Sequence, residues 1–328
     1  MTRQQVLKGL EAAEYQRHAV HAADRLWVEK NCYVDVIIEM LHALGLEPLA
    51  AMGFCAAIDF EGDNFTFFKP NHEELRLLYG VDVQELNVWL PLIEHANHHL
   101  GEGKFIGTEA DSFWLPDTAG TDYRTNHVKS TIILADLDEG SRRLGYFHNA
   151  GYFELGGDDF ERLFRIGAAP DPTFLPLFAE LVRVDRMIRR SMDELAAMAA
   201  ARLPVHLGRR PADNPVRRFQ ARFERELLRM QERGLASYHP WAFATTRQLG
   251  ASAELLSMHL RWLADAGTVE GLGAAPDDFL RLSAGAKTFI LKAARAVNNK
   301  KPFDASPLFD EMAGAWDTGM AALAGATG

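Results

Sequence analysis

A change in sequence pattern near residues 170–172 is the feature that most constrains the fold of this chain. Before that point, short apolar runs alternate with turns rich in Gly, Pro, Asn and Asp, a pattern typical of strands. After it, apolar residues recur at helical spacing, in stripes that run from Phe174 to Leu195, Val216 to Met230, Leu249 to Leu263, Phe279 to Val297 and Leu308 to Leu323. We therefore expect an α+β protein, with a mostly antiparallel sheet in residues 1–169 and a helical domain of five helices in residues 170–328.

The first half is expected to alternate helices and strands. The helices are expected at residues 32–44, 72–79 and 91–100, and the strands at residues 50–60, 65–70, 83–89, 104–111, 127–135, 144–149 and 152–155. The first two strands read as a β-hairpin. His18 and His21 lie in a polar N-terminal segment, and we expect them to be solvated.

Composition limits the classes of partner. The net charge of -10 at pH 7 argues against non-specific nucleic-acid binding by the whole chain. Two cysteines, Cys32 and Cys55, provide no disulfide framework and fit a reducing cytosol. The N-terminus is polar rather than an apolar signal core, and no apolar run is long enough to cross a bilayer. These observations predict a cytoplasmic protein with no nucleic-acid or membrane partner.

Cys32 is the candidate nucleophile. Asn31 can cap a helix in which Cys32 occupies the first turn and which Gly45 closes. A thiol there would face unpaired N–H groups and the positive end of the helix dipole, both of which favour the thiolate form. The alternative is a small buried cysteine that packs in a core, which is also how we interpret Cys55.

A candidate base lies about a hundred residues further on. If the chain from His127 to Asn149 is a symmetric hairpin with its midpoint at residue 138, these two residues face each other across the strands. A helical Cys, a strand His and then an Asn is the chain order of papain-like enzymes, in which the third residue orients the base. His148 or Asp138 could be the orienting residue instead. Alternatively, His127 is a strand-end histidine bonded to a loop carbonyl, and Asn149 is a turn residue.

Several motifs resemble a bacterial family of domains of unknown function. They are Asn31-Cys32-Tyr33-Val34-Asp35, Asp59-Phe60-Glu61-Gly62-Asp63, Leu78-Tyr79-Gly80, Leu115-Pro116-Asp117-Thr118 with Tyr123, Arg124 and His127, and Tyr146-Phe147-His148-Asn149. That family is associated with amino acid:carrier-protein ligases. The layout is also distantly similar to the butirosin-biosynthesis acyltransferase family, which has a papain-like Cys-His-Asp/Asn site and a carrier-protein substrate.

The resemblance implies a papain-like N-terminal domain and acyl transfer. Cys32 would attack the thioester of an aminoacyl-phosphopantetheine arm, His127 would act as the base and Asn149 would orient it. The remaining roles follow the same resemblance: an oxyanion hole from Asn31 or Gln84, and substrate binding by Asp35, Asp111, Tyr123 and Arg124. No cofactor is expected to be bound, because the partner carries the phosphopantetheine.

The expected partners are an aminoacyl carrier protein and, as a further candidate, an amino acid:carrier-protein ligase. Arg218, Arg222 and Arg225 follow helical spacing in an acidic chain, so they could dock an acidic carrier protein, or form an ordinary solvated face. The segment Glu94–His99 has zinc-ligand spacing but lacks a strong third ligand, and we expect no metal. Two alternative functions are a cysteine hydrolase on the same site (peptidase, amidase or thioesterase) and a non-catalytic docking protein.

Overall fold

A computed structural model describes residues 3–169, 171 and 173–327, and these divide into two compact units. The first unit takes the described residues of 1–22, 32–48 and 71–189. The second takes those of 23–31, 49–70 and 190–328. The chain therefore passes between the units several times, whereas the sequence pattern predicts a single boundary at residues 169 and 170.

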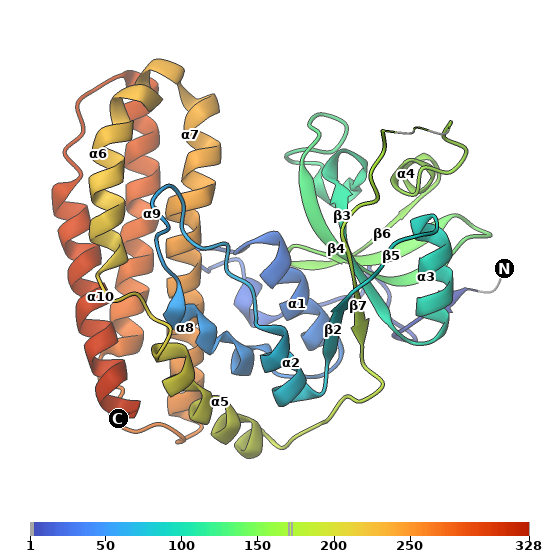
Figure 1. The fold of residues 1–328 in the computed structure, drawn as a ribbon, viewed down its shortest axis with the longest axis horizontal. Helices are drawn as coiled ribbons and strands as arrows, with labels where there is room; N and C mark the ends of the chain where they lie inside the picture. Colours follow the sequence, from blue (N-terminus) through green and yellow to red (C-terminus); the bar gives the residue numbers. More distant parts are fainter. Residues whose placement is uncertain (1–2, 170, 172, 328) are drawn as a thin grey trace. The chain divides into compact units, whose positions relative to one another are not determined.

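The first unit is built on an antiparallel sheet with the strand order β2-β7-β3-β4-β5-β6, and β1 pairs with β4 (Figure 1). The strands are β1 (Gln4–Gln5), β2 (Asp82–Glu85), β3 (Phe105–Asp111), β4 (Lys129–Asp138), β5 (Arg143–His148), β6 (Gly151–Gly156) and β7 (Ala179–Arg183). The expected α+β class with a mostly antiparallel sheet is therefore confirmed.

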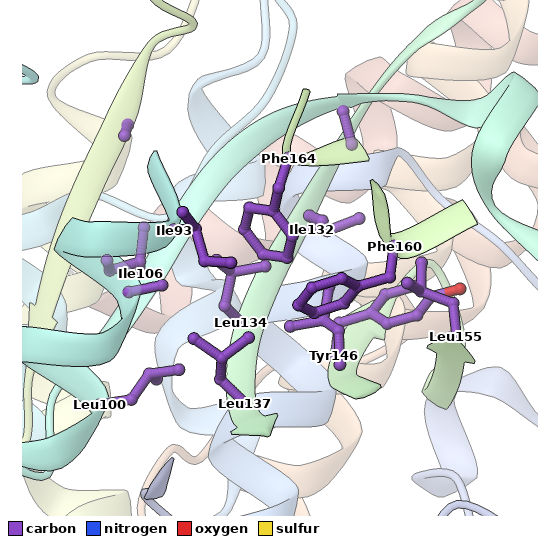
Figure 2. Packing of buried hydrophobic residues seen from close by; sticks show 14 of the residues in the cluster. Ile93, Leu100, Ile106, Ile132, Leu134, Leu137, Tyr146, Leu155, Phe160 and Phe164 are labelled. Atoms are coloured by element: carbon purple, nitrogen blue, oxygen red, sulfur yellow. The ribbon is translucent and has the colours of Figure 1, made fainter. Parts of the chain in front are cut away.

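Helices pack on the two faces of this sheet. They are α1 (Cys32–Ala43), α2 (His72–Tyr79), α3 (Leu92–Gly101) and α4 (Asp158–Leu163), with short 3-10 turns η1 (Ala19–His21), η3 (Ser112–Trp114) and η4 (Pro116–Thr118). Helix α1 contacts β4, β5 and β6. On the opposite face, Figure 2 shows side chains of α3 and of residues 158–164 meeting those of the strands, among them Ile93, Leu100, Ile132, Leu134, Tyr146, Phe160 and Phe164. Alternation along β4 produces this division, since successive side chains of a strand point to opposite faces.

Gly80 ends α2 as the sequence predicts. Its φ of 68° is left-handed, and a Cβ at this position would lie 2.1 Å from the Arg186 carbonyl oxygen. Only glycine fits a site that combines this conformation with so close a backbone approach.

The second unit is helical. Its helices are α5 (Met192–Leu207), α6 (Pro215–Arg233), α7 (Leu235–Ala242), the π-helical segment η5 (Phe243–Arg247), α8 (Gln248–Asp265), α9 (Ala275–Asn299) and α10 (Ser306–Thr327). The predicted stripe of α6 is buried at Val216, Phe219, Phe223 and Met230. Phe219 and Phe223 pack against Phe289 and Phe309, with ring centroids 4.9–5.9 Å apart. This aromatic cluster joins α6 to α9 and α10.

Two strand predictions are wrong. Residues 50–60 form most of a 3-10 helix, η2 (Pro48–Ala57), in which Ala50 to Cys55 are all buried. Because the segment is buried on every side, its apolar pattern does not mark one face of a strand. The predicted hairpin with residues 65–70 is reduced to a single bridge between Phe60 and Phe65.

The predicted boundary at residues 169 and 170 differs from the structure for a clear reason. Strand β7 lies after it and pairs with both β2 and β3 inside the sheet. The apolar residues of 174–182 were expected to begin a helix, but this pairing is made with strands about 75 to 100 positions earlier. The first unit therefore continues to residue 189.

Candidate functional site

The first unit contains a cavity of about 780 Å³. Its walls come from the end of β3, the residues before β4, the start of α3, the end of α4 and the segment after it. The lining includes Asp111, Trp114, His127, Arg162, Arg165, Phe174 and Leu177. A cavity of this size with apolar walls and a few polar groups is the usual form of a small-molecule site.

His127 and Asp111 form a hydrogen-bonded pair on the wall of this cavity. His127 Nδ1 lies 2.6 Å from Asp111 Oδ2, and the imidazole stacks on Phe113 with a centroid distance of 4.3 Å and an interplanar angle of 8°. The other carboxylate oxygen, Asp111 Oδ1, accepts the Phe113 backbone N–H at 3.1 Å. Because a carboxylate only accepts, Nδ1 carries the proton and Nε2 of the neutral ring is left as the basic nitrogen.

Cys32 lies in the first turn of α1, as predicted, and is partly exposed. Its Sγ lies 3.6 Å from Thr131 Oγ1 on β4. Residue 127 precedes Thr131 by four positions, which corresponds to about 13 Å of extended chain. The structure therefore places the thiol and the His127 imidazole beside different partners.

Asn149 does not face His127. The register pairs Ile132 with His148 and Asp138 with Arg143, so the hairpin turns near residue 140 rather than 138. Asn149 lies in the turn between β5 and β6 with a φ of 43°. The predicted orienting role of Asn149 is wrong, and the alternative interpretation as a turn residue is correct. Asp111 is the residue that lies beside His127, and its predicted role in substrate binding stays a prediction.

The two residues predicted for the oxyanion hole have other positions. The Asn31 side-chain nitrogen donates to Phe68 O at 2.9 Å and to Gln248 Oε1 at 3.5 Å, within the second unit. Gln84 lies on β2, which β7 and β3 separate from β4. At roughly 4.8 Å per strand, β2 is about 14 Å from β4, where Cys32 makes its contact.

Asp35 is fully buried and takes part in a charged cluster rather than in substrate binding. Its Oδ1 lies 2.9 Å from His21 Nε2, and the other ring nitrogen of His21 bonds Glu39. His21 is also fully buried, so the expectation that it is solvated is wrong. Burial lowers the pKa of His21, but the hydrogen bonds to Asp35 and Glu39 outweigh it and raise the pKa from 6.5 to about 8.

Tyr123 and Arg124 both bind Asp159 in α4. The Tyr123 hydroxyl donates to Asp159 Oδ2 at 2.8 Å, and the Arg124 guanidinium donates to Oδ1 at 2.5 Å. The guanidinium also lies over the Trp114 ring, 4.6 Å from its centroid. These contacts fix the loop before β4 and support the cavity wall at Trp114.

The sequence interpretation missed a second chain of hydrogen bonds, on the face of β4 opposite Cys32. Ser130 Oγ lies 2.6 Å from His148 Nε2, and His148 Nδ1 lies 2.5 Å from Asp117 Oδ2. His148 was considered only as an orienting residue for His127. The available signal was the alternation of β4, which puts Ser130 and Ile132 on one face, with His148 opposite Ile132.

The three arginines proposed for carrier docking lie on α6, and each has a hydrogen-bond or ion-pair partner. Arg218 pairs with Asp59 and donates to Phe60 O, Arg222 pairs with Glu226 at 2.8 Å, and Arg225 Nε donates to Ala221 O. Neighbouring carboxylates thus offset two of the three charges. Docking at this face stays a prediction.

Within the described part of the chain, one group of metal-type ligands lies close together. His98, His99 and Glu102 have ligand atoms within 4.8 Å of one another. His95, one of the residues in the segment with zinc-ligand spacing, accepts the backbone N–H groups of Trp89 and Leu90 at 3.3 Å.

Comparison with known proteins identifies both halves of the chain. A model of the DUF1839 N-terminal domain matches residues 16–184, and one of the DUF1839 C-terminal domain matches residues 192–325. The junction between them falls where the first structural unit ends. No curated protein matches the chain, and none of the described helices is long and apolar enough to cross a bilayer. Because the two matches cover most of the sequence, the chain belongs to the DUF1839 family and carries both of its domains.

Proposed function

We propose that this protein is an acyl-transfer enzyme whose substrate site is the 780 Å³ cavity and whose general base is His127. The observation that carries the proposal is the hydrogen bond between His127 Nδ1 and Asp111 Oδ2 on the cavity wall. A histidine whose tautomer is fixed by a carboxylate, and whose second nitrogen is available, is a common arrangement for general base catalysis.

In the proposed reaction, His127 Nε2 removes the proton of an acceptor amine, hydroxyl or water as it attacks the acyl carbonyl. The Asp111 carboxylate stabilises the imidazolium that forms. The proton then passes from Nε2 to the leaving group. Stacking on Phe113 holds the ring in one plane, so little reorientation is needed before the proton moves.

The chemistry of the cavity favours an acyl group on an anionic arm. Trp114, Phe174 and Leu177 offer apolar walls. Arg162 and Arg165 add positive charge, and their guanidinium groups lie over Trp114 and Phe174, 5.8 and 3.8 Å from the ring centroids. The phosphate of a phosphopantetheine thioester can pair with these guanidinium groups, and an aminoacyl carrier protein, the partner that the sequence resemblance implies, is the proposed donor.

The test is the rate of thioester loss from an aminoacyl-pantetheine thioester and from an aminoacyl carrier protein. We expect His127→Gln to lower that rate by about 10²- to 10⁴-fold, the usual contribution of a general base. Asp111→Asn should lower it too, because the amide cannot stabilise the imidazolium. His98→Gln is the matched control, since His98 is exposed on α3 and does not line the cavity. A His127→Gln variant with the full rate would refute the proposal.

A covalent acyl-Cys32 intermediate is the second candidate. What favours it is the position of a partly exposed thiol in the first turn of α1, with α1 packed against the sheet. The test is the intact mass after mixing with the aminoacyl carrier protein, and an adduct that hydroxylamine removes is expected on Cys32. Cys55 is the internal control, because burial raises the pKa of its thiol and keeps it protonated.

Products distinguish the remaining functions. Free amino acid as the sole product indicates a hydrolase, and an amide or ester of an added acceptor indicates a transferase. Carrier binding without thioester loss, unchanged in Cys32→Ala and His127→Gln, indicates a docking protein. In that case Arg225→Glu should weaken the binding, and Arg209→Glu, at an exposed position in the turn between α5 and α6, serves as a charge-matched control.

A further inference from the structure

We propose that Ser130 is a second nucleophile of this protein, activated by His148 and Asp117 as a Ser-His-Asp relay. The inference goes beyond the role of His127, since it concerns a different histidine and a covalent intermediate. Only the identity of the natural acyl donor rests on the proposed function of the cavity.

The distances and hydrogen-bond directions are those that a relay requires. Asp117 Oδ2 accepts from His148 Nδ1 at 2.5 Å, and its other oxygen accepts from the Tyr146 hydroxyl. With the proton on Nδ1, His148 Nε2 is an acceptor, and the Ser130 hydroxyl 2.6 Å away is its donor. Each group therefore points its proton towards the next base in the chain.

The relay is rigid where it must orient the base and more open at the nucleophile. The His148 and Asp117 side chains are 1% and 4% exposed. Ser130 is partly exposed. His148 belongs to β5 and Ser130 to β4, and they are diagonal neighbours because Ile132, two positions after Ser130, pairs with His148.

Ser130 also lies beside the cavity. Its cross-strand partner Ala110 lines the cavity, as do Val128 and Lys129, the two residues before it. Ala110 and Ser130 share one face of the sheet, since paired residues point the same way. An acyl group in the cavity can thus approach the serine from the side on which His148 lies.

In the proposed step, Ser130 Oγ bonds to the carbonyl carbon of a thioester while its proton moves to His148 Nε2. The tetrahedral intermediate then breaks its C–S bond, and the proton on Nε2 goes to the departing thiolate. An acyl-serine ester and a free thiol result. Water or an acceptor amine resolves the ester by the same sequence, with its proton passing through Nε2 to Ser130 Oγ.

The alternative is a structural chain of hydrogen bonds that satisfies a buried histidine. A fluorophosphonate probe separates the two, because it phosphonylates an activated serine and releases fluoride, whereas a structural serine does not react. We expect one adduct, located on Ser130 by peptide mass spectrometry. Labelling should be lost in Ser130→Ala, fall at least 10²-fold in rate in His148→Gln, and be unchanged in Ser141→Ala.

A variant that avoids loss of folding keeps the test decisive. Ser130→Cys preserves the size of the side chain. The thiol at position 130 should react with iodoacetamide faster than the Cys32 thiol does. Its reaction rate should fall in the double variant that also carries His148→Gln. No adduct on Ser130 in the wild type, or labelling at full rate in a folded His148→Gln variant, overturns the relay. His127→Gln should retain labelling, so failure of the relay and failure of the proposed function are told apart.

Discussion

The buried cluster of His21, Asp35 and Glu39 should stabilise the first unit at low pH, and this stabilisation should be lost as the pH rises through about 8. His21 is enclosed, with one ring nitrogen at Asp35 and the other at Glu39. Both bonds favour the protonated ring, and they raise its pKa from 6.5 to about 8 against the opposing effect of burial. The cluster ties the N-terminal segment to α1, where the Tyr15 hydroxyl and the His18 backbone N–H also bind Glu39.

The magnitude follows from linkage between protonation and folding. Below pH 6.5 the ring of His21 is protonated in both the folded and the unfolded chain, so its stabilisation is fully present. Between 6.5 and about 8 only the folded state holds the proton, and above about 8 neither does. At about 1.4 kcal/mol per pH unit, the loss is about 2 kcal/mol, or roughly 30-fold in an opening equilibrium.

Hydrogen exchange at the amides of residues 32–43 measures this locally. We expect protection, after correction for the intrinsic exchange rate, to fall by roughly 30-fold between pH 6 and pH 9 in the wild type. In His21→Gln the cluster no longer titrates, so the helix should be less protected at pH 6 and its protection should change far less with pH. His98→Gln, at an exposed position of α3, should behave as the wild type.

If the protection of residues 32–43 changes with pH as steeply in a folded His21→Gln variant as in the wild type, the reasoning is refuted. That result would mean that His21 is neutral in the native state and that the cluster is held by ordinary hydrogen bonds.

Acidic pH offers a second check on the same cluster. Burial raises the pKa of Glu39, but the hydrogen bonds from His21, Tyr15 and the His18 N–H outweigh it, so the pKa is lowered. Stability from Glu39 is present above 4.5 and should decline as the pH falls below that value.

Further predictions concern packing and reactivity. Gly80→Ala should destabilise the first unit by about 1 kcal/mol or more, seen as a lower thermal midpoint, because the left-handed φ and the close Arg186 carbonyl exclude a Cβ. In the native protein the buried Glu254 carboxylate lies 2.9 Å from Lys30 Nζ. Lys30→Met leaves that carboxylate buried without its cation, so it should destabilise the second unit by about 3–5 kcal/mol in urea unfolding. Native protein should give one thiol reactive to a disulfide reagent, and it should disappear in Cys32→Ala, since Cys55 is buried.

Local signals in the sequence predict much of the first unit. The strands at residues 104–111 and 144–149 and the helices at 72–79 and 91–100 carry their own alternation, period or stop residue, and all four are present within a few residues of the expected bounds. Strand β7 has no such signal. The spacing of apolar residues from 174 onward fits a helix, and only pairing with β2 and β3 makes 179–183 a strand.

The errors at the site come from register rather than from residue type. Strand β4 continues to Asp138, which moves the turn from residue 138 to about residue 140 and separates Asn149 from His127. The pairing of His127 with Asp111 depends on a loop of fifteen intervening residues, whose path no periodicity predicts. Candidate residues can thus be chosen from the sequence by type, while their partners require the three-dimensional structure.

The alternation of β4 places the two candidate nucleophiles beside opposite faces of the sheet. Thr131 contacts Cys32 on the face covered by α1, and Ser130 bonds His148 on the opposite face, beside the cavity. The cavity lining includes the cross-strand partners of both strand residues, Ala110 for Ser130 and Glu109 for Thr131, so variants have to decide between the two nucleophiles. If Ser130 carries the acyl group, Ser130→Ala should abolish acylation and Cys32→Ala should leave it intact. The reverse pattern would place the acyl group on the face covered by α1 and refute the role of Ser130.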